Sequence, residues 1–283
     1  MRHHPHCPPR GVAHHTRVAG HFGELLQGRL GPDGPVALIT LPCPALAVRA
    51  TWKPGPGLGL WQGARPVLSG TRLRQLFATL GLGRARGRLR LRADMPPGGG
   101  AGASTAALLA TARCLSGGAL SPEAEAALCL SLEGATDPLM LARPERTLWA
   151  PRRAVALGSL PPLPAIDVVG GFAGAGRPTD PVDMRFADID DLVADWRRTA
   201  TRAGFAALAS ESARRNHALR GGPDPAPVQA AGRRLGALGV VAAHTGAALG
   251  LIFAPGTVPP DTGQTLRALG LFGVVRFRAG GAA

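Results

Sequence analysis

The segment best suited to chemistry is rich in glycine and reads PPGGGAGASTAA over residues 96–107. Glycines in a turn let backbone N–H groups approach phosphate oxygens, because no Cβ obstructs them. The run from Ala103 to Leu115 predicts a helix directly afterwards, and a helix N-terminus adds unpaired donors and a positive dipole end. Ser104 falls in the first turn, where its hydroxyl can meet a phosphate oxygen or a magnesium ion. The chain has 40 glycines, so a flexible turn before a buried helix is a competing interpretation.

Two carboxylates, Glu133 and Asp137, lie close together in the segment LEGATDP, at the end of a predicted helix and the start of a loop. Phosphoryl transfer uses one carboxylate to hold magnesium and another to accept or orient the hydroxyl proton. Taken alone, the segment is better explained as a helix C-terminus followed by a solvated acidic loop. The neighbouring motifs therefore decide between these interpretations.

The glycine-rich loop is not a Walker A motif, because no lysine follows its last glycine, and its spacing is not GxGxxG. It resembles the second motif of GHMP kinases, the family of galactokinase, homoserine kinase, mevalonate kinase and phosphomevalonate kinase. The family pattern is Pro-x-x-x-Gly-Leu-Gly-Ser-Ser-Ala-Ala, and this chain has Ala101 for the Leu and Ala103 for the first Ser. The retained serine, Ser104, matches the family position that contacts magnesium or phosphate.

Two other segments resemble the remaining motifs of the family, and all three come in the family order. Residues 17–28, RVAGHFGELLQG, resemble the first motif, which ends in Gly-Glu and shapes the substrate pocket. GELLQG followed by LPCP is similar to the L-threonine kinases of cobalamin synthesis and propanediol utilisation, with His21 and Phe22 in place of a Ser and a Cys. Residues 241–251, VAAHTGAALGL, resemble that group's third motif, a strand–turn–strand beside the active site. The resemblance spans about residues 16–255.

The resemblance implies an ATP- and Mg²⁺-dependent kinase for a small hydroxylated amino acid, with L-threonine as the best substrate and O-phospho-L-threonine, a cobalamin precursor, as the product. LEGATDP resembles the Glu-x-Thr-Asp segment of the threonine kinases, which implies catalytic roles for Ser104, Glu133 and Asp137. Ser104 and Glu133 would hold the metal, and Asp137 would contact the substrate hydroxyl or the metal. Nucleotide binding is expected from Pro97, Gly98, Gly99, Gly100, Ala101, Gly102, Ala103, Ser104 and Thr105. Substrate binding is expected from His21, Gly23, Glu24, His244, Thr245 and Gly246.

Weaker candidates have ordinary structural alternatives. Glu211, Ser212 and Asn216 resemble a Ser-Ala-x-x-Asn helix of the threonine-kinase group and would face the substrate, or else form the polar side of an amphipathic helix. Thr179 and Asp180 lie in a loop that could cover the active site. His244 and Thr245 also fit structural roles, as a strand-end histidine and a turn residue.

The elements around the loop follow from local patterns. Residues 88–92, RLRLR, alternate Arg and Leu and predict a half-buried strand before the loop, with the arginines on a solvated face. Pro122 and Glu123 suit the first turn of a helix that runs through Leu132. Residues 71–81 carry leucines and a phenylalanine at helical spacing and predict an amphipathic helix.

The remaining chain alternates between strands, loops and helices. A hairpin turn is predicted at 32–34 before a strand at 36–41, and residues 53–70 read as loop. Residues 143–165, rich in Pro and Arg, are predicted to contain a domain boundary. Beyond it, the patterns predict strands at 166–172, 239–244, 250–255 and 272–277, and helices at about 187–219 and 226–238.

The net charge of +14 raises the question of a nucleic-acid partner. Aromatic residues make up 4% of the chain, Lys53 is its one lysine, and no nucleic-acid-binding module is recognisable. We therefore expect no nucleic-acid partner. The positive charge would still raise the local concentration of anions such as ATP.

Composition favours a cytoplasmic enzyme. The chain has 283 residues, 45% of them hydrophobic, which is enough for the core of one large domain or two modest ones. No window offers the roughly 18 apolar residues of a membrane span, and the first residues lack the apolar stretch of a secretory signal, so no membrane partner is expected. Four cysteines without a CxxC pair indicate reduced thiols. A flexible leader over residues 1–15 is expected to hold His3, His4, His6 and Cys7 without forming a metal site.

The expected architecture is the two-lobe α+β fold of GHMP kinases. Residues 16–150 would form an N-terminal domain with the ATP phosphate loop, resembling a ribosomal-protein-like fold, and residues 151–283 a ferredoxin-like C-terminal domain. ATP and substrate would meet between them.

Two alternatives to a threonine kinase stay open. One is another GHMP kinase, acting on homoserine or an isoprenoid alcohol, and the other is a catalytically silent binding protein of the same fold. Polar, charged walls around His21, Phe22, Glu24 and His244 would favour an amino acid, whereas a long apolar slot would favour an isoprenoid. Intact Ser104, Glu133 and Asp137 argue against the silent protein.

Overall fold

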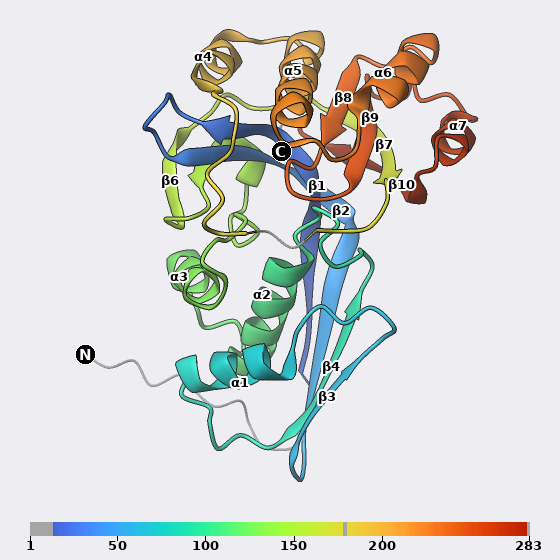
Figure 1. Cartoon of the computed structure of the whole chain (residues 1–283). Coiled ribbons are helices and arrows are strands. Elements are labelled where there is room, and N and C mark those ends of the chain that lie inside the picture. The colour runs from blue at the N-terminus through green and yellow to red at the C-terminus, as the bar shows by residue number, and fades with distance from the viewer. Residues whose placement is uncertain (1–13, 178–179, 282–283) are drawn as a thin grey trace.

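A computed structural model describes residues 14–177 and 180–281, which form a mixed α+β fold (Figure 1). The strands are β1 (His14–Arg29), β2 (Val36–Pro54), β3 (Leu58–Gln62), β4 (Gly87–Ala93), β5 (Thr147–Ala150), β6 (Val155–Ser159), β7 (Ile166–Phe172), β8 (Gly239–Ala242), β9 (Ala248–Phe253) and β10 (Phe272–Ala279). The helices are α1 (Gly70–Thr79), α2 (Ala103–Ser116), α3 (Pro122–Glu133), α4 (Asp190–Arg198), α5 (Arg202–Arg220), α6 (Pro225–Arg234) and α7 (Thr262–Ala268). Within the described residues, no helix has the length and apolar character needed to cross a membrane.

The described strands belong to one sheet, whose main path runs β10-β7-β9-β8-β1-β2-β4-β3. β1 and β2 form a long antiparallel hairpin that extends through both halves of the molecule (Figure 1). β5 pairs with β2 and with β6, away from the main path. The C-terminal strands join the hairpin through β8, where Glu24 of β1 lies opposite Ala242. Glu24 therefore stands at the junction between the N-terminal and C-terminal strands.

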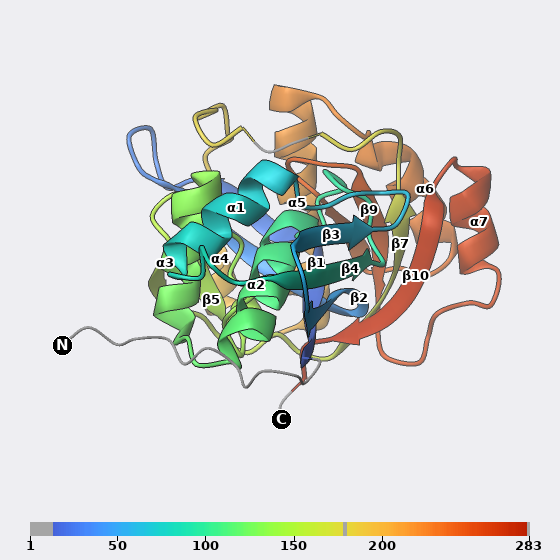
Figure 2. The same ribbon diagram turned by 90° about the horizontal axis from the view of Figure 1, so that it is seen from below.

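The helices cover the two halves of the sheet separately. α1, α2 and α3 gather beside the N-terminal strands, and α2 packs directly on β1 and β2 (Figures 1 and 2). α5 packs on β8 and β1, and α6 packs on β8 and β9. α2 buries all of its residues except Ser104 and Arg113. A helix so uniformly apolar is held by packing on every side, which fixes the position of its N-terminus.

Most predicted elements are confirmed, with boundaries that follow local capping. The Ser69 hydroxyl accepts the Arg72 N–H at the start of α1, and the Ser121 hydroxyl accepts the Ala124 N–H at the start of α3. The alternation in β4 is also confirmed, because its arginines are exposed and its leucines buried. The leader predicted over residues 1–15 is wrong at its end, because His14 and His15 are the first residues of β1 and pair with β2. The rest of the predicted leader, residues 1–13, and Thr179 of the predicted covering loop lie outside the described residues.

Three parts of the chain differ from the sequence predictions. The expected loop at 53–70 contains the short edge strand β3. The segment at 143–165 contains the hairpin β5–β6, and the domain boundary predicted there stays a prediction. The helix expected at 187–219 is two helices, because α4 ends at Thr199 and Thr201 caps α5 through the Gly204 N–H. The short helix α7 was missed. Elements of four to seven residues give too few repeats for a periodic pattern to stand out.

Phe22 of β1 is a fully buried residue of the main hydrophobic core, where it meets the C-terminal strands. Its side chain has 0% exposure, and its ring centroid lies 5.9 Å from that of Phe172 and 5.7 Å from that of Phe277. It also covers the paired glycines Gly170 and Gly250, where an added Cβ would lie 2.5 Å and 3.0 Å from the ring. Because these glycines have no side chain, the ring packs directly on the backbone of β7 and β9 and holds β1 beside them.

We predict that Phe22→Ala lowers the free energy of unfolding by about 3–5 kcal/mol, because it removes a fully buried aromatic ring and leaves a cavity. Urea unfolding followed by tryptophan fluorescence measures the change. Leu269→Ala is the matched control, since Leu269 is 40% exposed, and it should change stability by no more than about 0.5 kcal/mol. Equal effects of the two substitutions would contradict the packing role of Phe22.

Candidate active site

A cavity of about 460 Å³ lies where β1, the loop before α2, the α3–β5 connection and the turn after β8 meet. Among the residues predicted to bind nucleotide, all except Ala101 line it. The two predicted carboxylates, Glu133 and Asp137, line the cavity as well. So do four of the residues predicted to bind substrate: His21, Glu24, His244 and Thr245. The structure therefore brings together segments that are more than 200 residues apart in the chain.

The glycine-rich loop adopts a conformation that requires glycine. Gly98, Gly100 and Gly102 have φ values of 67°, 73° and 68°, in the left-handed region. Gly102 precedes the first turn of α2, and a Cβ there would lie 2.6 Å from the His21 ring. No side chain caps α2 at Gly102, so no cap from the described residues takes the first N–H donors of the helix. These donors suit an anion.

Carbonyl groups of the loop are bound on its outer side. The carbonyl of Gly99 accepts the N–H groups of residues 247 and 248 at 3.0 Å and 2.9 Å. The carbonyl of Gly100 accepts from Gly23 at 3.0 Å, and that of Ala101 accepts from His21 at 3.2 Å. Gly23 and Ala101, which do not line the cavity, thus support the loop. Gly246 also supports it, because a Cβ at Gly246 would collide with the backbone of Gly99 and Gly100.

Ser104 and Glu133 meet at the N-terminus of α2. The Ser104 hydroxyl donates a hydrogen bond to Oε1 of Glu133. Burial raises the pKa of the Glu133 carboxyl, while the Ser104 hydroxyl and the Arg72 guanidinium oppose that rise. The exposed Ser104 hydroxyl and the partly buried Glu133 carboxyl, whose pKa is raised, are oxygen ligands that a hard divalent cation would stabilise.

His21, Glu24 and Asp137 form a second cluster in the wall of the cavity. The Nε2 atom of His21 lies 3.2 Å from Oδ2 of Asp137, and Nδ1 lies 3.5 Å from Oε1 of Glu24 and 3.2 Å from the Gly23 carbonyl. Facing atoms of the three residues lie within 4.8 Å of one another, a spacing that a metal ion could also use. Because a carbonyl only accepts, Nδ1 must carry a proton, and both ring nitrogens then serve as hydrogen-bond donors. The cluster is therefore a proton-sharing group.

The protonation of this cluster follows from its burial and charges. Burial disfavours the charged imidazole, but the carboxylates of Glu24 and Asp137 outweigh it and raise the pKa of His21 to about 9. Burial raises the pKa of Glu24 to about 8, against the attraction of His21. The hydroxyl of Thr40 donates to Oε2 of Glu24 at 3.0 Å. At neutral pH, His21 is an imidazolium ion that donates to Asp137, and Glu24 retains its proton.

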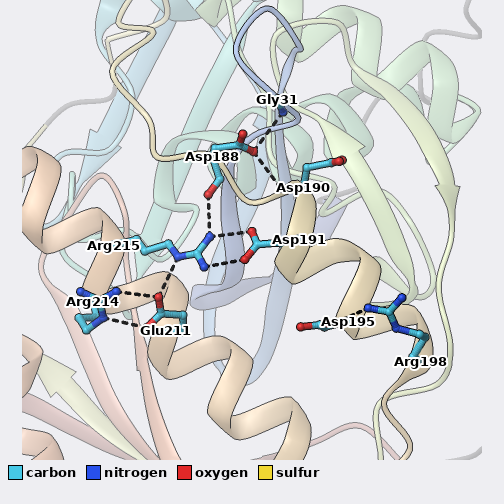
Figure 3. Close-up of polar contacts among 9 residues, drawn as sticks. All are labelled: Gly31, Asp188, Asp190, Asp191, Asp195, Arg198, Glu211, Arg214 and Arg215. Atoms are coloured by element: carbon cyan, nitrogen blue, oxygen red, sulfur yellow. Dashed lines mark hydrogen bonds and ion pairs between the residues drawn. The ribbon is translucent and has the colours of Figure 1, made fainter.

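The three residues of α5 that were predicted to face the substrate have different surroundings. Ser212 and Asn216 are buried beside the turn after β8, and the Ser212 hydroxyl lies 2.9 Å from Nε2 of His244. Glu211 lines neither of the two cavities found in the described residues, so its predicted substrate contact is not supported. Instead, hydrogen bonds from Arg214 and Arg215 lower the pKa of Glu211 to about 2 (Figure 3).

The arginine network of Figure 3 positions α5. Arg215 bonds Glu211 on its own helix, both carboxylate oxygens of Asp191 on α4, and the Asp188 carbonyl. The Asp188 carboxylate in turn accepts the N–H groups of Gly31 and Asp190. This network joins α5, α4 and the β1–β2 turn. It fixes the helix that presents Ser212 and Asn216 on its neighbouring face.

Sequence reasoning missed three cavity arginines and one glutamine: Arg72, Arg152, Arg177 and Gln27. The Nη1 atom of Arg72 is buried, has no hydrogen-bond partner among the described residues, and lies 3.9 Å from Oε1 of Glu133. The Arg152 guanidinium donates hydrogen bonds to the carbonyl groups of Pro181 and Asp183. Arg72 lies in a helix that was predicted to be amphipathic. Polar residues are expected on the solvent face of such a helix, so the sequence did not mark Arg72 as a site residue.

Comparisons with known proteins identify the fold. The sequence matches no protein-family profile and no curated protein. The structure is similar to mevalonate kinase from Methanococcus jannaschii, with a TM-score of 0.66 at 12% identity over 97% of this chain and 100% of that chain. It is also similar to a Listeria monocytogenes protein named as a homoserine kinase, with a TM-score of 0.60 at 16% identity over 96% and 98%. A 4-(cytidine 5'-diphospho)-2C-methyl-D-erythritol kinase gives 0.60 at 20% identity over 95% and 100%. The described part of the chain therefore has the α+β fold of GHMP kinases.

The raised pKa values of His21 and Glu24 predict that the protein loses stability as the pH rises from about 4.5, the unfolded pKa of Glu24, to about 9. Both groups bind protons more tightly in the folded state than in the unfolded state. Their contribution is complete below the unfolded pKa and is lost as the pH passes the folded pKa. We expect the free energy of unfolding to fall by on the order of 2 kcal/mol across this interval.

Urea unfolding at several pH values measures this slope. Glu24→Gln should flatten it, because the substitution removes one titrating group and weakens the attraction that keeps His21 protonated. Glu123→Gln is the control: the pKa of Glu123 is lowered below 4.5, so it titrates outside the interval. If the Glu24→Gln variant keeps the wild-type dependence of stability on pH, the predicted pKa shifts of His21 and Glu24 are wrong.

Proposed function

We propose that this protein is an ATP- and Mg²⁺-dependent kinase that transfers the γ-phosphoryl group to the side-chain hydroxyl of L-threonine, for cobalamin biosynthesis. One observation carries the proposal. The glycine-rich loop, the Ser104–Glu133 pair and Asp137 face the same cavity, although they come from separate segments. This is the set of groups that phosphoryl transfer to an alcohol requires.

The nucleotide phosphates are proposed to lie against the loop and the N-terminus of α2. The left-handed glycines bring the loop backbone close to the cavity, although the Gly99 N–H already donates to the Pro96 carbonyl at 3.1 Å. The uncapped first turn adds N–H donors and the positive end of the helix dipole. These groups are fixed before the ligand arrives, so little reorganisation is needed as charge develops.

The residues present fit a magnesium ion between Ser104 and Glu133. A hydroxyl and a carboxylate are oxygen ligands, and the cation would balance the buried charge of Glu133. When bound, Mg²⁺ supplies charge neutralisation for the phosphate oxygens. Arg72 would add a fixed positive charge through its unpartnered Nη1 atom, which lies beside the same carboxylate.

Asp137 is proposed to accept the hydroxyl proton. The substrate oxygen attacks the γ-phosphorus, the bond from that phosphorus to the β,γ-bridging oxygen breaks, and ADP leaves. The proton of the hydroxyl passes to Asp137 as the new O–P bond forms. His21 donates to Oδ2 of Asp137, so it holds the carboxylate in one orientation. His21 is thereby a positioning residue.

Four polar side chains in the cavity wall support an amino acid over an isoprenoid alcohol. They are His21, Glu24, Gln27 and His244, whereas Phe22 is buried in the core. An isoprenoid chain would require a long apolar slot. Homoserine is the main alternative substrate, because one protein of similar structure is named as a homoserine kinase.

The function is tested with purified protein, Mg-ATP and a panel of alcohols: L-threonine, L-serine, L-homoserine, mevalonate and glycerol. ADP release and ³¹P NMR of the product are measured. We expect threonine to stimulate ADP release most strongly and to yield a phosphate monoester. Asp137→Asn should lower kcat by about 10²–10⁴-fold while the protein stays folded. No stimulation by any alcohol would reject the kinase, and stimulation by another alcohol alone would reject threonine.

Arg72 gives a matched pair of variants on one helix. Arg72→Gln should lower kcat/KM for ATP by about 10–100-fold, the cost of losing a charge-assisted contact to phosphate. Arg74→Gln is the control, because Arg74 is exposed and its one side-chain hydrogen bond goes to Thr71. Arg72→Lys should recover part of the loss. If both glutamine variants retain wild-type kcat/KM, Arg72 does not contact phosphate.

A further inference from the structure

One face of the N-terminal strands is exposed and carries a dense positive charge. Arg88, Arg90 and Arg92 of β4 are exposed, and the pairing of β4 with β2 places Lys53 opposite Arg88 and Arg49 opposite Arg92. Directly opposed residues of neighbouring strands point to the same face of a sheet. None of these five residues lines either of the cavities found in the described chain, so the charge lies outside the candidate active site.

This charge does not stabilise the sheet. Like charges directly opposite each other on neighbouring strands are destabilising, and Lys53 faces Arg88 while Arg49 faces Arg92. Asp94 relieves one of these pairs, because Arg49 donates to its two carboxylate oxygens at 2.9 Å and 2.8 Å. Lys53 and the three arginines of β4 form no ion pair with any described residue. Uncharged side chains would suit these exposed positions better, which indicates a negatively charged partner.

The sheet ends at β3, beside this face. β3 pairs with β4 along one side, and no strand of the described chain pairs with its other side (Figure 2). An edge strand presents unpaired N–H and C=O groups, and proteins commonly guard such an edge with charged residues or proline. β3 reads LGLWQ and has neither, while Leu58 is 41% exposed and Trp61 is 52% exposed. The β3 edge can therefore accept a further strand.

Two arginines of β4 are placed to reach this edge. Cζ of Arg90 lies 4.4 Å from the centroid of the Trp61 ring, a cation–π contact that holds the guanidinium over β3. Arg88 lies opposite Gly59, and a Cβ added to Gly59 would lie 3.5 Å from Cγ of Arg88. No side chain of β3 thus separates Arg88 from the edge. Both positive charges are available to a strand placed beside β3.

The two rows of side chains on β3 define what such a strand must carry. Successive side chains point to opposite faces, so Gly59 and Trp61 share the face of the β4 arginines. Leu58 and Leu60 lie on the other face, where Leu60 packs against the hydrophobic core. A strand added beside β3 would meet arginines on one face and leucines on the other. Alternating acidic and apolar residues match both rows, because residues i and i+2 of any strand are about 7 Å apart.

We propose that the β3 edge binds an extended segment of a partner protein in which acidic and apolar residues alternate. The segment adds a strand beside β3, with its acidic side chains facing Arg88 and Arg90 and its apolar side chains beside Leu58 and Leu60. Charge disfavours two other occupants: the β3 edge of a second copy would bring the same arginines, and residues 1–13 contain no Asp or Glu. The proposal does not depend on the kinase function, because this surface lies outside both cavities.

The test measures binding to the full-length protein by calorimetry with three probes. They are a ten-residue peptide that alternates Glu and Val, a peptide of the same composition with its Glu and Val in blocks, and a ten-nucleotide oligothymidylate. We expect the alternating peptide to bind at least tenfold more tightly than either of the others. It should also slow hydrogen exchange at the backbone amides of residues 58–62, because they become part of an interior strand.

Three results would overturn the proposal. The first is no binding of the alternating peptide. The second is equal binding of all three probes, which would show a surface for polyanions in general. The third is binding that leaves hydrogen exchange of residues 58–62 unchanged, since the peptide would then be held by charge alone and not as an added strand.

Variants assign the contacts. Arg88→Gln combined with Arg90→Gln should weaken binding of the alternating peptide at least tenfold, and Trp61→Ala should weaken it at least threefold. Arg74→Gln combined with Arg233→Gln is the matched control, because it removes the same charge from exposed positions on α1 and α6. It should change the affinity by less than twofold. All of these side chains are exposed, so the variants should keep the wild-type circular dichroism spectrum. Equal weakening by the two double variants would assign binding to net charge and reject the β3 edge.

Discussion

The constraint on which the rest of the site depends is the attachment of the glycine-rich loop by its carbonyl groups. Carbonyls of Gly99, Gly100 and Ala101 accept from β1 on one side and from residues 247–248 on the other. The Gly99 N–H in turn donates to the Pro96 carbonyl, so the loop also holds its own shape. N-terminal and C-terminal segments approach closely at this loop, which demands glycine at both Gly100 and Gly246. In the proposed kinase, the uncapped N–H groups at the start of α2 would be the donors left for phosphate.

Burying His21 with two carboxylates would be costly if each group kept a full charge. The cluster avoids this by retaining a proton on Glu24, so that one imidazolium faces one carboxylate. The arrangement directs the His21 proton toward Asp137 and leaves the other oxygen of Asp137 for a ligand. Titratable groups with strongly shifted pKa values in a cavity are typical of functional sites. In this protein the shifts come from the same contacts that join β1 to the α3–β5 connection.

Much of this site could be predicted from the sequence, because its parts are local. The loop before α2 and the carboxylates after α3 each lie beside a helix with a clear start or end, and the Gly-Glu of β1 belongs to a recognisable motif. Contacts between distant segments could not be predicted, and these include Arg72 beside Glu133 and the pairing of Ser212 with His244. Short elements such as β3 and α7 were missed for lack of periodicity. The division into two lobes near residue 150 stays a prediction, although the strands on both sides share one sheet.

The amino-acid composition adds a final constraint on how the cavity handles charge. Lys53 is exposed on β2, opposite Arg88, and does not line the cavity, so every permanent cation there is an arginine. Arginine stays protonated throughout the physiological range, whereas a buried lysine loses its proton readily. The positive charge that these arginines give the cavity is therefore independent of pH. Any pH dependence there must come from the groups whose pKa values are raised, His21, Glu24 and Glu133, since burial keeps His244 neutral. In the proposed kinase, anion binding and proton transfer would thus fall to different residues, and each could be altered without the other.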